Sequence, residues 1–187
     1  MKFPRINDQI KGMRIYLKMP TAKDAEKIFK YTQNKELLKY MMWSAPKSIK
    51  EVKKHIQDRI RKGKKGISFE MCIYSKENNE FIGSAGFVEV DIENESVELG
   101  YWVARPFWNN GIATEAVSLL LSYAFKSLKA HRVVIMCNPK NTRSRNIAEK
   151  LRFHMDGILR DHIKIRGKMT DKCFYSILNE ESKCLSK

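Results

Sequence analysis

The sequence has few cysteines and few histidines, and neither residue type is grouped along the chain. Its four cysteines are Cys72, Cys137, Cys173 and Cys184, and no pair has CxxC or metal-ligand spacing. The four histidines are equally dispersed, and no HExxH motif is present. We therefore expect reduced thiols in the core or on the surface, and no metal site.

Long apolar runs are also missing. Residues 1–12 lack the apolar h-region of a signal peptide, and no stretch reaches the ~18 apolar residues of a membrane span. We therefore expect a cytoplasmic protein without a membrane partner.

Acidic residues are scarce relative to basic ones. The chain has 21 Asp and Glu against 36 Lys and Arg, which gives a formal net charge of +15. Such an excess favours polyanions or highly phosphorylated ligands. The basic runs at residues 59–65 and 160–172 are typical of solvated surface, but they could also contact RNA, a ribosome or a cofactor phosphate. An RNA-binding module is therefore one hypothesis, although no helix-turn-helix or aromatic RNA-binding motif is present.

No internal repeat or linker interrupts the 187 residues. A chain of this length is enough for one sizeable core and short for two. Apolar residues make up 43% and charged residues 30%, which is near the globular average. We expect one domain over residues 1–187.

Hydrophobic periodicity predicts a mixed sheet with helices on its faces. Helices are expected after Thr21, after the Ser48 and Glu51 capping pair, over residues 111–128, and over residues 141–151. Alternating or β-branched runs predict strands at residues 14–19, 67–73, 81–90, 97–103, 132–137, 158–165 and 172–178. This order predicts an α/β (α+β) fold with about seven strands.

Residues 97–115 combine a strand, a tight turn and the start of a helix. Gly111 and the two asparagines before it can adopt positive φ. The first amides of the following helix lack internal partners, and with the helix dipole they form an anion site suited to a pyrophosphate. Neither a P-loop nor a three-glycine dinucleotide fingerprint is present. Many such turns bind nothing, so an ordinary connection is the alternative.

Three blocks of sequence occur in register, at residues 98–102 (ELGYW), 108–116 (WNNGIATEA) and 141–150 (NTRS followed by EK). Together they resemble the GNAT superfamily of acetyl-CoA-dependent N-acetyltransferases, and within it the RimJ/RimL-type branch that acts on ribosomal proteins. The likeness extends over residues 13–178. It implies a mostly antiparallel central sheet flanked by helices. The fourth strand of the family (98–104 here) splays from the fifth (132–137), and the pantetheine arm lies in the gap.

The resemblance also implies acetyl-CoA as cosubstrate and a set of residues that hold it. Backbone groups near Trp102 and Val103 would bond the pantetheine amides, and Asn141 would reach the arm from the other side. Arg143 would contact a phosphate, unless it is an ordinary exposed helix residue. Amides of residues 109–114 would hold the pyrophosphate. The expected cofactor set is Trp102, Val103, Trp108, Asn109, Asn110, Gly111, Ile112, Ala113, Thr114, Asn141 and Arg143.

Three positions depart from the family pattern. Asn109 stands where glycine is usual, but asparagine tolerates left-handed backbone angles. Ala148 replaces a tyrosine that serves many relatives as a phenolic acid, which leaves Ser144 as the donor. Arg152 replaces a glycine before Phe153, which puts the local turn geometry in question.

Glu98 and Ser144 are the candidate catalytic residues. Alternation places Glu98 on the same strand face as Trp102, beside the expected thioester, where it could take a proton from the amine directly or through water. The alternative is a surface or paired carboxylate. Ser144 could protonate the departing sulfur, or simply bond its own helix backbone. Cys137 is interpreted as a small core hydrophobe and not as an acyl carrier, so we expect direct transfer.

The acceptor is only broadly indicated. An α-amino group with a pKa near 8 is already about a tenth neutral at pH 7, so the first candidate is a protein N-terminus, such as that of a ribosomal protein. A small amine or an antibiotic is an alternative. A third is an RNA- or ribosome-binding module whose cofactor site is not catalytic. Tyr40, Met42, Trp43 and the connection at residues 166–170 are expected near the acceptor, although the apolar segment could instead pack on the core. The sequence does not indicate an oligomeric state.

Overall fold

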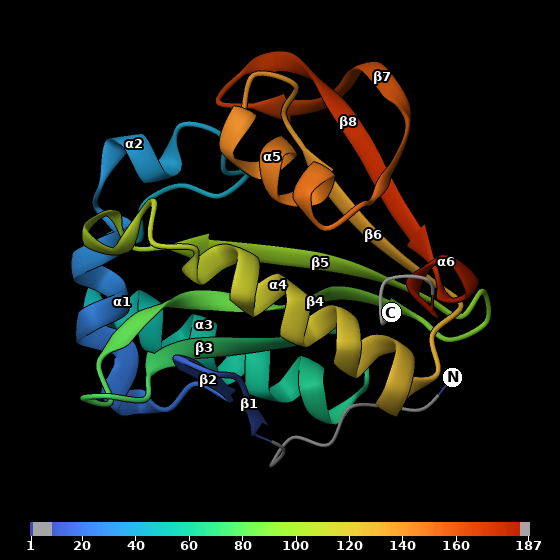
Figure 1. Ribbon diagram of the computed structural model, residues 1–187. Coiled ribbons are helices and arrows are strands. Elements are labelled where there is room, and N and C mark those ends of the chain that lie inside the picture. The colour runs from blue at the N-terminus through green and yellow to red at the C-terminus, as the bar shows by residue number, and fades with distance from the viewer. Residues whose placement is uncertain (2–8, 184–187) are drawn as a thin grey trace.

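The computed structural model describes residue 1 and residues 9–183 of the chain, and its centre is an eight-stranded sheet (Figure 1). The strand order is β1-β2-β3-β4-β5-β6-β8-β7. The strands are β1 Ile10–Lys11, β2 Ile15–Lys18, β3 Phe69–Ser75, β4 Phe81–Asp91, β5 Ser96–Val103, β6 Arg132–Cys137, β7 His154–Ile165 and β8 Lys168–Leu178. The α-helices are α1 Ala25–Thr32, α2 Lys35–Leu38, α3 Ile49–Lys64, α4 Ile112–Tyr123, α5 Thr142–Lys150 and α6 Asn179–Lys183.

All neighbouring strands are antiparallel except β5 and β6, which run parallel. The expected mixed, mostly antiparallel sheet is therefore confirmed, with one strand more than predicted. The added strand is the two-residue β1, which pairs with β2 and is too short to show alternation. The hairpin of β7 and β8 is also longer than its apolar pattern indicated, because its outer part is mostly exposed and polar.

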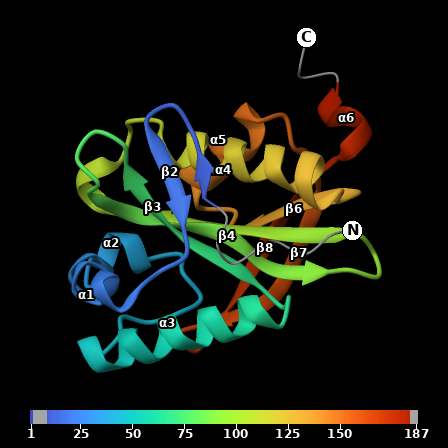
Figure 2. The same cartoon turned by 90° about the horizontal axis from the view of Figure 1, so that it is seen from below.

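Helices α1 and α3 lie on one face of the sheet, and α4 and α5 lie on the other (Figures 1 and 2). On the first face, Ile28, Val52 and Ile56 pack against aromatic residues of the sheet. On the second face, the apolar stripe of α4, including Val117 and Leu120, is fully buried. Both stripes follow the helical spacing seen in the sequence, which is why these helices were predictable. Within the described residues, no helix has the length and apolar character needed to cross a membrane.

Two predicted helix starts have the expected caps. The Glu51 N–H donates to Ser48 Oγ at 3.2 Å at the start of α3. The Ser144 N–H donates to Asn141 Oδ1 at 3.4 Å at the start of α5. Each side chain satisfies a backbone donor that the first helical turn leaves unpaired. In contrast, the single-turn helix α2 was not predicted, because four residues carry too little periodicity.

Strands β5 and β6 separate part-way along their length. Their pairing runs from Ser96↔Arg132 to Leu99↔Ile135 and then stops, although both strands continue. The predicted splay is confirmed, and Figure 1 shows the two strands diverging as an open V. A register shift in β4 at Val88 offers a cause. A β-carbon on Gly100 would lie 2.4 Å from Val88 Cγ1, so the bulged residue occupies the space next to Gly100. Bulges increase local twist, which turns β5 away from β6.

Helix α5 ends in a turn at Arg152, the position where the family pattern has a glycine. Arg152 adopts a left-handed φ of 60°, and the Phe153 N–H donates to the Ala148 carbonyl at 2.9 Å. The helix therefore ends in a Schellman motif with a non-glycine residue at the strained position.

Replacing Arg152 by glycine should stabilise the protein. Glycine removes the steric cost of the left-handed conformation, and we expect a gain of about 1 kcal/mol in the free energy of unfolding. For a chain of this size that corresponds to a rise of about 2–4 °C in melting temperature. Arg152→Ala is the control, because it keeps the β-carbon and should bring no such gain. Equal melting temperatures for the glycine and alanine variants would contradict this account.

Candidate active site

A cavity of about 550 Å³ lies at the splay. It is lined by Glu98, Gly100 and Trp102, which share one face of β5, and by Leu99 and Tyr101 from the other face. Successive side chains of a strand point to opposite faces of its sheet. One cavity can touch both sets only through the opening between β5 and β6. The cavity therefore connects the α3 face of the sheet to the α5 face.

Glu98 lines this cavity on the α3 face, together with Trp102, as the alternation predicted. Its side chain is partly buried. Burial raises the pKa of its carboxyl, the nearby Lys172 ammonium opposes that shift, and Glu89 adds to it, so that the pKa lies above its ordinary value. A half-buried carboxyl with a raised pKa is suited to accept a proton near neutral pH.

Ser144 lies on the opposite side of the opening, one turn into α5. Its Oγ is 2.8 Å from the phenol oxygen of Tyr101, where either group can donate. Burial raises the pKa of Tyr101 well above its usual value, with a smaller opposing effect from the Ser144 hydroxyl. Tyr101 therefore remains protonated over the accessible pH range. It was absent from the predicted site, because the alternation of β5 assigns it to the core face and only the splay opens that face to the cavity.

Ala148 lies on the buried face of α5 and is fully buried. A tyrosine at this position would overfill the core as it is packed here. No phenol can therefore come from the position where many relatives place one, and the nearby hydroxyls are those of Ser144 and Tyr101.

Cys137 ends β6 and lines the cavity. Burial and the neighbouring Cys173 raise the pKa of its thiol to about 11, and a hydrogen bond with Ser144 opposes that effect. A thiol with this pKa is almost fully protonated at pH 7 and is a poor nucleophile. Three of the four cysteines, Cys72, Cys137 and Cys173, lie in the described part of the chain, and all three are buried and unpaired. Cys184 lies outside the described residues.

Some backbone groups of β5 face the opening. The Ala104 N–H donates to the Ile82 carbonyl, so alternate residues of β5, including Trp102, direct their backbone groups to β4. Those of Tyr101 and Val103 face the gap. The geometry therefore favours Val103 and Tyr101 as partners of a bound chain, and the backbone of Trp102 does not fit the expectation. Trp102 lines the cavity on the α3 face of the sheet instead.

The loop before α4 has the backbone geometry expected of an anion site. Asn109 has φ 63° and Gly111 has φ 73°, so the asparagine adopts the left-handed angle that the family pattern assigns to glycine. Gly111 is the N-cap of α4. In the described structure, the amides of Ile112, Ala113 and Thr114 have no protein acceptor. Three free donors at the positive end of a twelve-residue helix are arranged to bind a phosphate group.

The loop before α4 is held by an ion pair between Arg14 and Glu115 that the sequence did not reveal. Arg14 Nε donates to Glu115 Oε2 at 2.8 Å, and Arg14 Nη1 donates to the Asn110 carbonyl at 2.8 Å. Glu115 Oε1 also accepts the backbone N–H groups of Arg14 and Ile15. The pair ties the loop carbonyl to the start of β2. Arg14 and Glu115 are 101 residues apart in the chain, so no local pattern indicates their contact.

Glu115→Gln should weaken the binding of a phosphorylated ligand at this loop. The substitution removes the charge from the bonds that fix Arg14 under Asn110, and charge-assisted bonds are about twice as strong as neutral ones. We expect KM for the cosubstrate predicted from the sequence, acetyl-CoA, to rise roughly tenfold with little change in kcat, because this substitution alters the support of the loop and not the residues that line the cavity. Asp156→Asn, which breaks the ion pair with Arg132 elsewhere in the sheet, is the matched control. A fall in kcat without a change in KM would contradict the positioning role.

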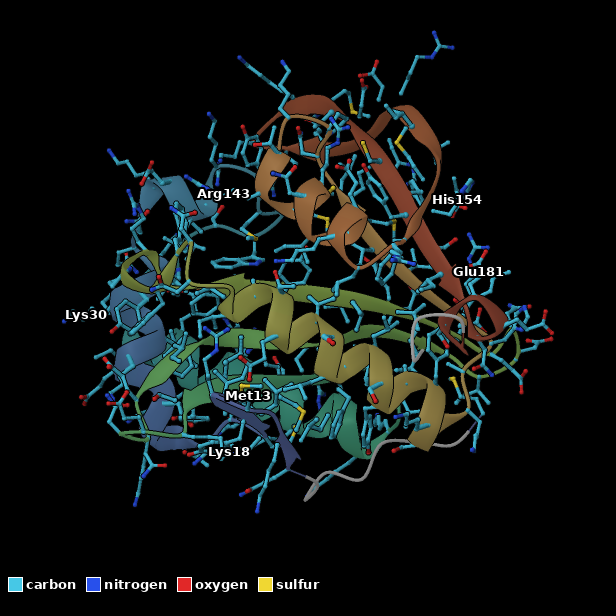
Figure 3. All side chains as sticks on the ribbon, in the orientation of Figure 1. Met13, Lys18, Lys30, Arg143, His154 and Glu181 are labelled. Carbon is cyan, nitrogen blue, oxygen red and sulfur yellow. The ribbon has the colours of Figure 1, made fainter. Side chains whose placement is uncertain are left out.

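Trp108 lies between this loop and α5. Its indole N–H donates to the Val103 carbonyl at 2.6 Å, and the Arg143 guanidinium carbon is 4.0 Å from the ring centroid. Arg105 lies over the same ring at 4.9 Å and pairs with Glu36. In Figure 3, Arg143 is found at the wide end of the V, beside α5. These contacts join the two sides of the opening at its outer end.

The predicted acceptor residues Tyr40, Met42 and Trp43 all line the cavity on the α3 face. The Trp43 ring contacts Trp102 edge-on, with 6.4 Å between ring centroids. The turn between β7 and β8 also reaches this region, since Arg166 Nη2 donates to the Leu38 carbonyl at 2.6 Å. Both basic runs contribute lining residues, namely Arg59, Arg61 and Lys62 from α3 and Lys172 from β8. None of these four was a predicted site residue.

Among the described residues, no three His, Cys, Asp or Glu side chains are grouped as metal ligands.

Known proteins resemble this chain along most of its length. A family model described as an acetyltransferase (GNAT) domain matches residues 14–154. The uncharacterized N-acetyltransferase p20 of Bacillus licheniformis is 33% identical over 168 residues, 90% of this chain and 94% of that protein. The ribosomal protein uS5-alanine N-acetyltransferase of Escherichia coli is 27% identical over 109 residues, 58% of this chain and 56% of that protein. In fold, the chain matches RimL, a ribosomal α-N-protein acetyltransferase in complex with coenzyme A, with a TM-score of 0.85 at 20% identity, over 93% of this chain and 99% of that one.

Proposed function

Because this chain belongs to the GNAT family and is an N-acetyltransferase, we propose that it moves an acetyl group directly from acetyl-CoA to a primary amine, first of all a protein N-terminal α-amino group. We propose further that residues 1–187 form a single catalytic domain. The observation that carries the proposal is the cavity through the sheet, with Glu98 on one side and the Ser144–Tyr101 pair on the other. A base and an acid on opposite sides of an opening are what transfer between two substrates requires.

The residues present fit acetyl-CoA. The free amides of Ile112, Ala113 and Thr114 would hold the pyrophosphate, with Arg143 as a further phosphate partner. The backbone groups of Tyr101 that face the gap, and Asn141 on α5, would bond the amides of the pantetheine arm. When bound, acetyl-CoA supplies an acetyl thioester, whose C–S bond breaks as the N–C bond of the product forms.

On the acceptor side, Glu98 would remove the proton from the attacking amine. An α-amino group with a pKa near 8 needs less help from a base than a lysine near 10.4. Because the pKa of Glu98 is raised, it lies closer to the pKa of the amine, which favours proton transfer. Trp43 and Trp102 would exclude water around the reacting nitrogen.

On the cofactor side, Ser144 would donate its hydroxyl proton to the departing sulfur while Tyr101 passes its own proton to the serine across their 2.8 Å contact. Glu98 would release the amine proton to solvent, and the phenol would regain a proton from solvent before the next cycle, so that Tyr101 is protonated at rest. The gap-facing N–H of Val103 would polarise the carbonyl oxygen of the acetyl group. The protonated thiol of Cys137 favours direct transfer over an acyl-cysteine route.

The choice of a protein N-terminus as acceptor is supported by relatives that are named for ribosomal-protein acetylation, at modest identity. It is also consistent with the cavity lining on the α3 face, where Tyr40, Met42 and Trp43 would surround the end of an acceptor chain.

Isothermal titration with acetyl-CoA, followed by an amine screen, tests the proposal. We expect saturable one-to-one binding that needs the pantetheine arm, and then release of free thiol in the presence of N-terminal peptides. Desulfo-CoA and an adenine nucleotide without the arm are the controls for simple attraction to the basic surface. Binding of the nucleotide as tight as that of acetyl-CoA, or a thiol release that no amine accelerates, would refute the proposed activity.

A further inference from the structure

Lys172 is an unusually placed cation in the acceptor half of the cavity. It lies on β8 opposite Leu159 of β7, lines the cavity, and has only 7% of its surface exposed. No hydrogen bond or ion pair connects its ammonium to any other residue in the part of the chain that the structure describes. Its Nζ is not among the fully buried side-chain atoms that lack a partner in the described residues, so the ammonium keeps some accessible surface and is open to the cavity that the lysine lines. Lysines with so little total exposure usually have a charged partner.

The acidic groups nearby do not supply a partner. Glu70 is paired with Arg59, and Asp171 accepts the backbone N–H of Asp161. Glu98 is near enough for Lys172 to lower the pKa of its carboxyl, but it forms no ion pair with the lysine. A Glu98 that binds the incoming amine also cannot neutralise Lys172 at the same time. The Lys172 ammonium is therefore available to a negatively charged group that enters this side of the cavity.

We propose that the acceptor supplies this charge, and that the Lys172 ammonium binds an anionic oxygen, most simply a carboxylate, which the acceptor carries within a few bonds of its amine. The cavity would then match an acceptor with two groups, since Glu98 faces the amine and Lys172 faces the acid. This inference rests on the proposed function in treating the α3 side of the cavity as the acceptor site. It narrows the acceptor to two kinds of amine. One is a peptide N-terminus with Asp or Glu among its first residues, and the other is a free acidic amino acid.

The alternative role for Lys172 is to keep Glu98 ionised without contacting the acceptor. That role would affect every acceptor equally, whereas a binding role distinguishes acidic from neutral acceptors. The basic surface of the protein could also attract acidic peptides in general. Attraction between exposed charges is largely screened by salt, whereas a contact inside the cavity is screened much less.

The test is binding of matched peptides to protein saturated with coenzyme A, measured by isothermal titration in 0.5 M salt, about where exposed charges are screened. One peptide has Glu as its second residue, its partner has Gln there, and free aspartate is compared with asparagine to separate chain ends from amino acids. We expect the acidic member of at least one pair to bind roughly tenfold more tightly to the wild type. Lys172→Met keeps the apolar stem and should abolish that preference, while Lys172→Arg should retain part of it.

Lys164→Met is the control, because it removes the same charge from an exposed position on the same hairpin. It should leave the preference unchanged. Equal affinities for both members of both pairs in the wild type, no binding by any of them, or a preference that survives Lys172→Met would each overturn the inference. Turnover is measured separately. Acidic peptides that bind through Lys172 but are never acetylated would refute the proposed function while leaving the binding site intact.

Discussion

Glu98→Gln should lower kcat by about 10²- to 10⁴-fold while leaving the affinity for acetyl-CoA unchanged, since that range is typical of the loss of a general base. Glutamine has nearly the same shape but cannot accept the proton of the amine. Wild-type turnover should rise with pH through the raised pKa of Glu98, because only the ionised carboxylate is a base. The variant should lose this step, and its rate should recover at higher pH as more amine becomes neutral. The measurement is kcat as a function of pH with one N-terminal peptide.

Stability provides the first control for this substitution. Burial raises the pKa of Glu98, so the folded state binds this proton more tightly than the unfolded chain. The stabilisation that results is complete below the unfolded pKa and is lost as pH rises through the folded pKa. At neutral pH the ionised carboxylate therefore opposes folding, and Glu98→Gln should melt at the same temperature as the wild type or higher. Low activity together with a lower melting temperature would point to misfolding.

Glu89→Gln is the second control. Glu89 of β4 lies opposite Glu98 of β5 in the strand register, but its side chain is exposed. We expect wild-type turnover, with a small shift of the pH profile to lower pH, because Glu89 contributes to the raised pKa of Glu98. Unchanged turnover in Glu98→Gln, or an equal loss in both variants, would remove Glu98 from the mechanism.

Ser144→Ala should lower kcat by roughly a hundredfold, at the lower end of the range for a lost proton donor, because a thiolate leaves more easily than an amine or an alkoxide. Tyr101→Phe should have a smaller effect, since it leaves the Ser144 hydroxyl in place and removes only its 2.8 Å partner. The double variant should be no slower than Ser144→Ala, because both residues act through one proton path. The measurement is single-turnover acetyl transfer in the three variants.

The outcome with Tyr101 decides between two arrangements. If Tyr101→Phe is slower than Ser144→Ala, the phenol itself faces the sulfur, and the serine only holds it. If the two losses are additive, the residues act separately, and the proposed relay is wrong. Cys137→Ala should keep most of the activity in either case, since its protonated thiol has no part in direct transfer.

Most elements of the fold could be predicted, because their signals are local. The stripe of α4, the caps Ser48 and Asn141, and the β-branched run of β6 each lie within one segment of chain. The backbone conformation of the loop before α4 was predictable for the same reason, since Asn109 and Gly111 are residues that tolerate the positive φ they adopt there. The family resemblance added the splay, which no periodicity in β5 or β6 indicates.

The parts of the site that could not be predicted depend on contacts between distant segments. The alternation of β5 assigns Tyr101 to the core side of the strand. Tyr101 reaches the cavity only because β5 turns away from β6 beyond the bulge at Val88. Lys172 stands in a basic run typical of solvated surface, and it becomes buried only because the hairpin of β7 and β8 borders the cavity. Arg14 and Glu115 meet only when β2 packs against the start of α4.

The contact between Arg143 and Trp108 closes the wide end of the V, and this has a kinetic consequence for inhibitors. A single molecule that joins coenzyme A to a peptide would have a bulky group on each face of the sheet and a thin linker between the strands. We expect that neither bulky group threads between the strands, so that the linker enters sideways past Trp108. Such a conjugate should associate slowly and dissociate slowly, and Trp108→Ala should speed both steps while changing the equilibrium affinity much less.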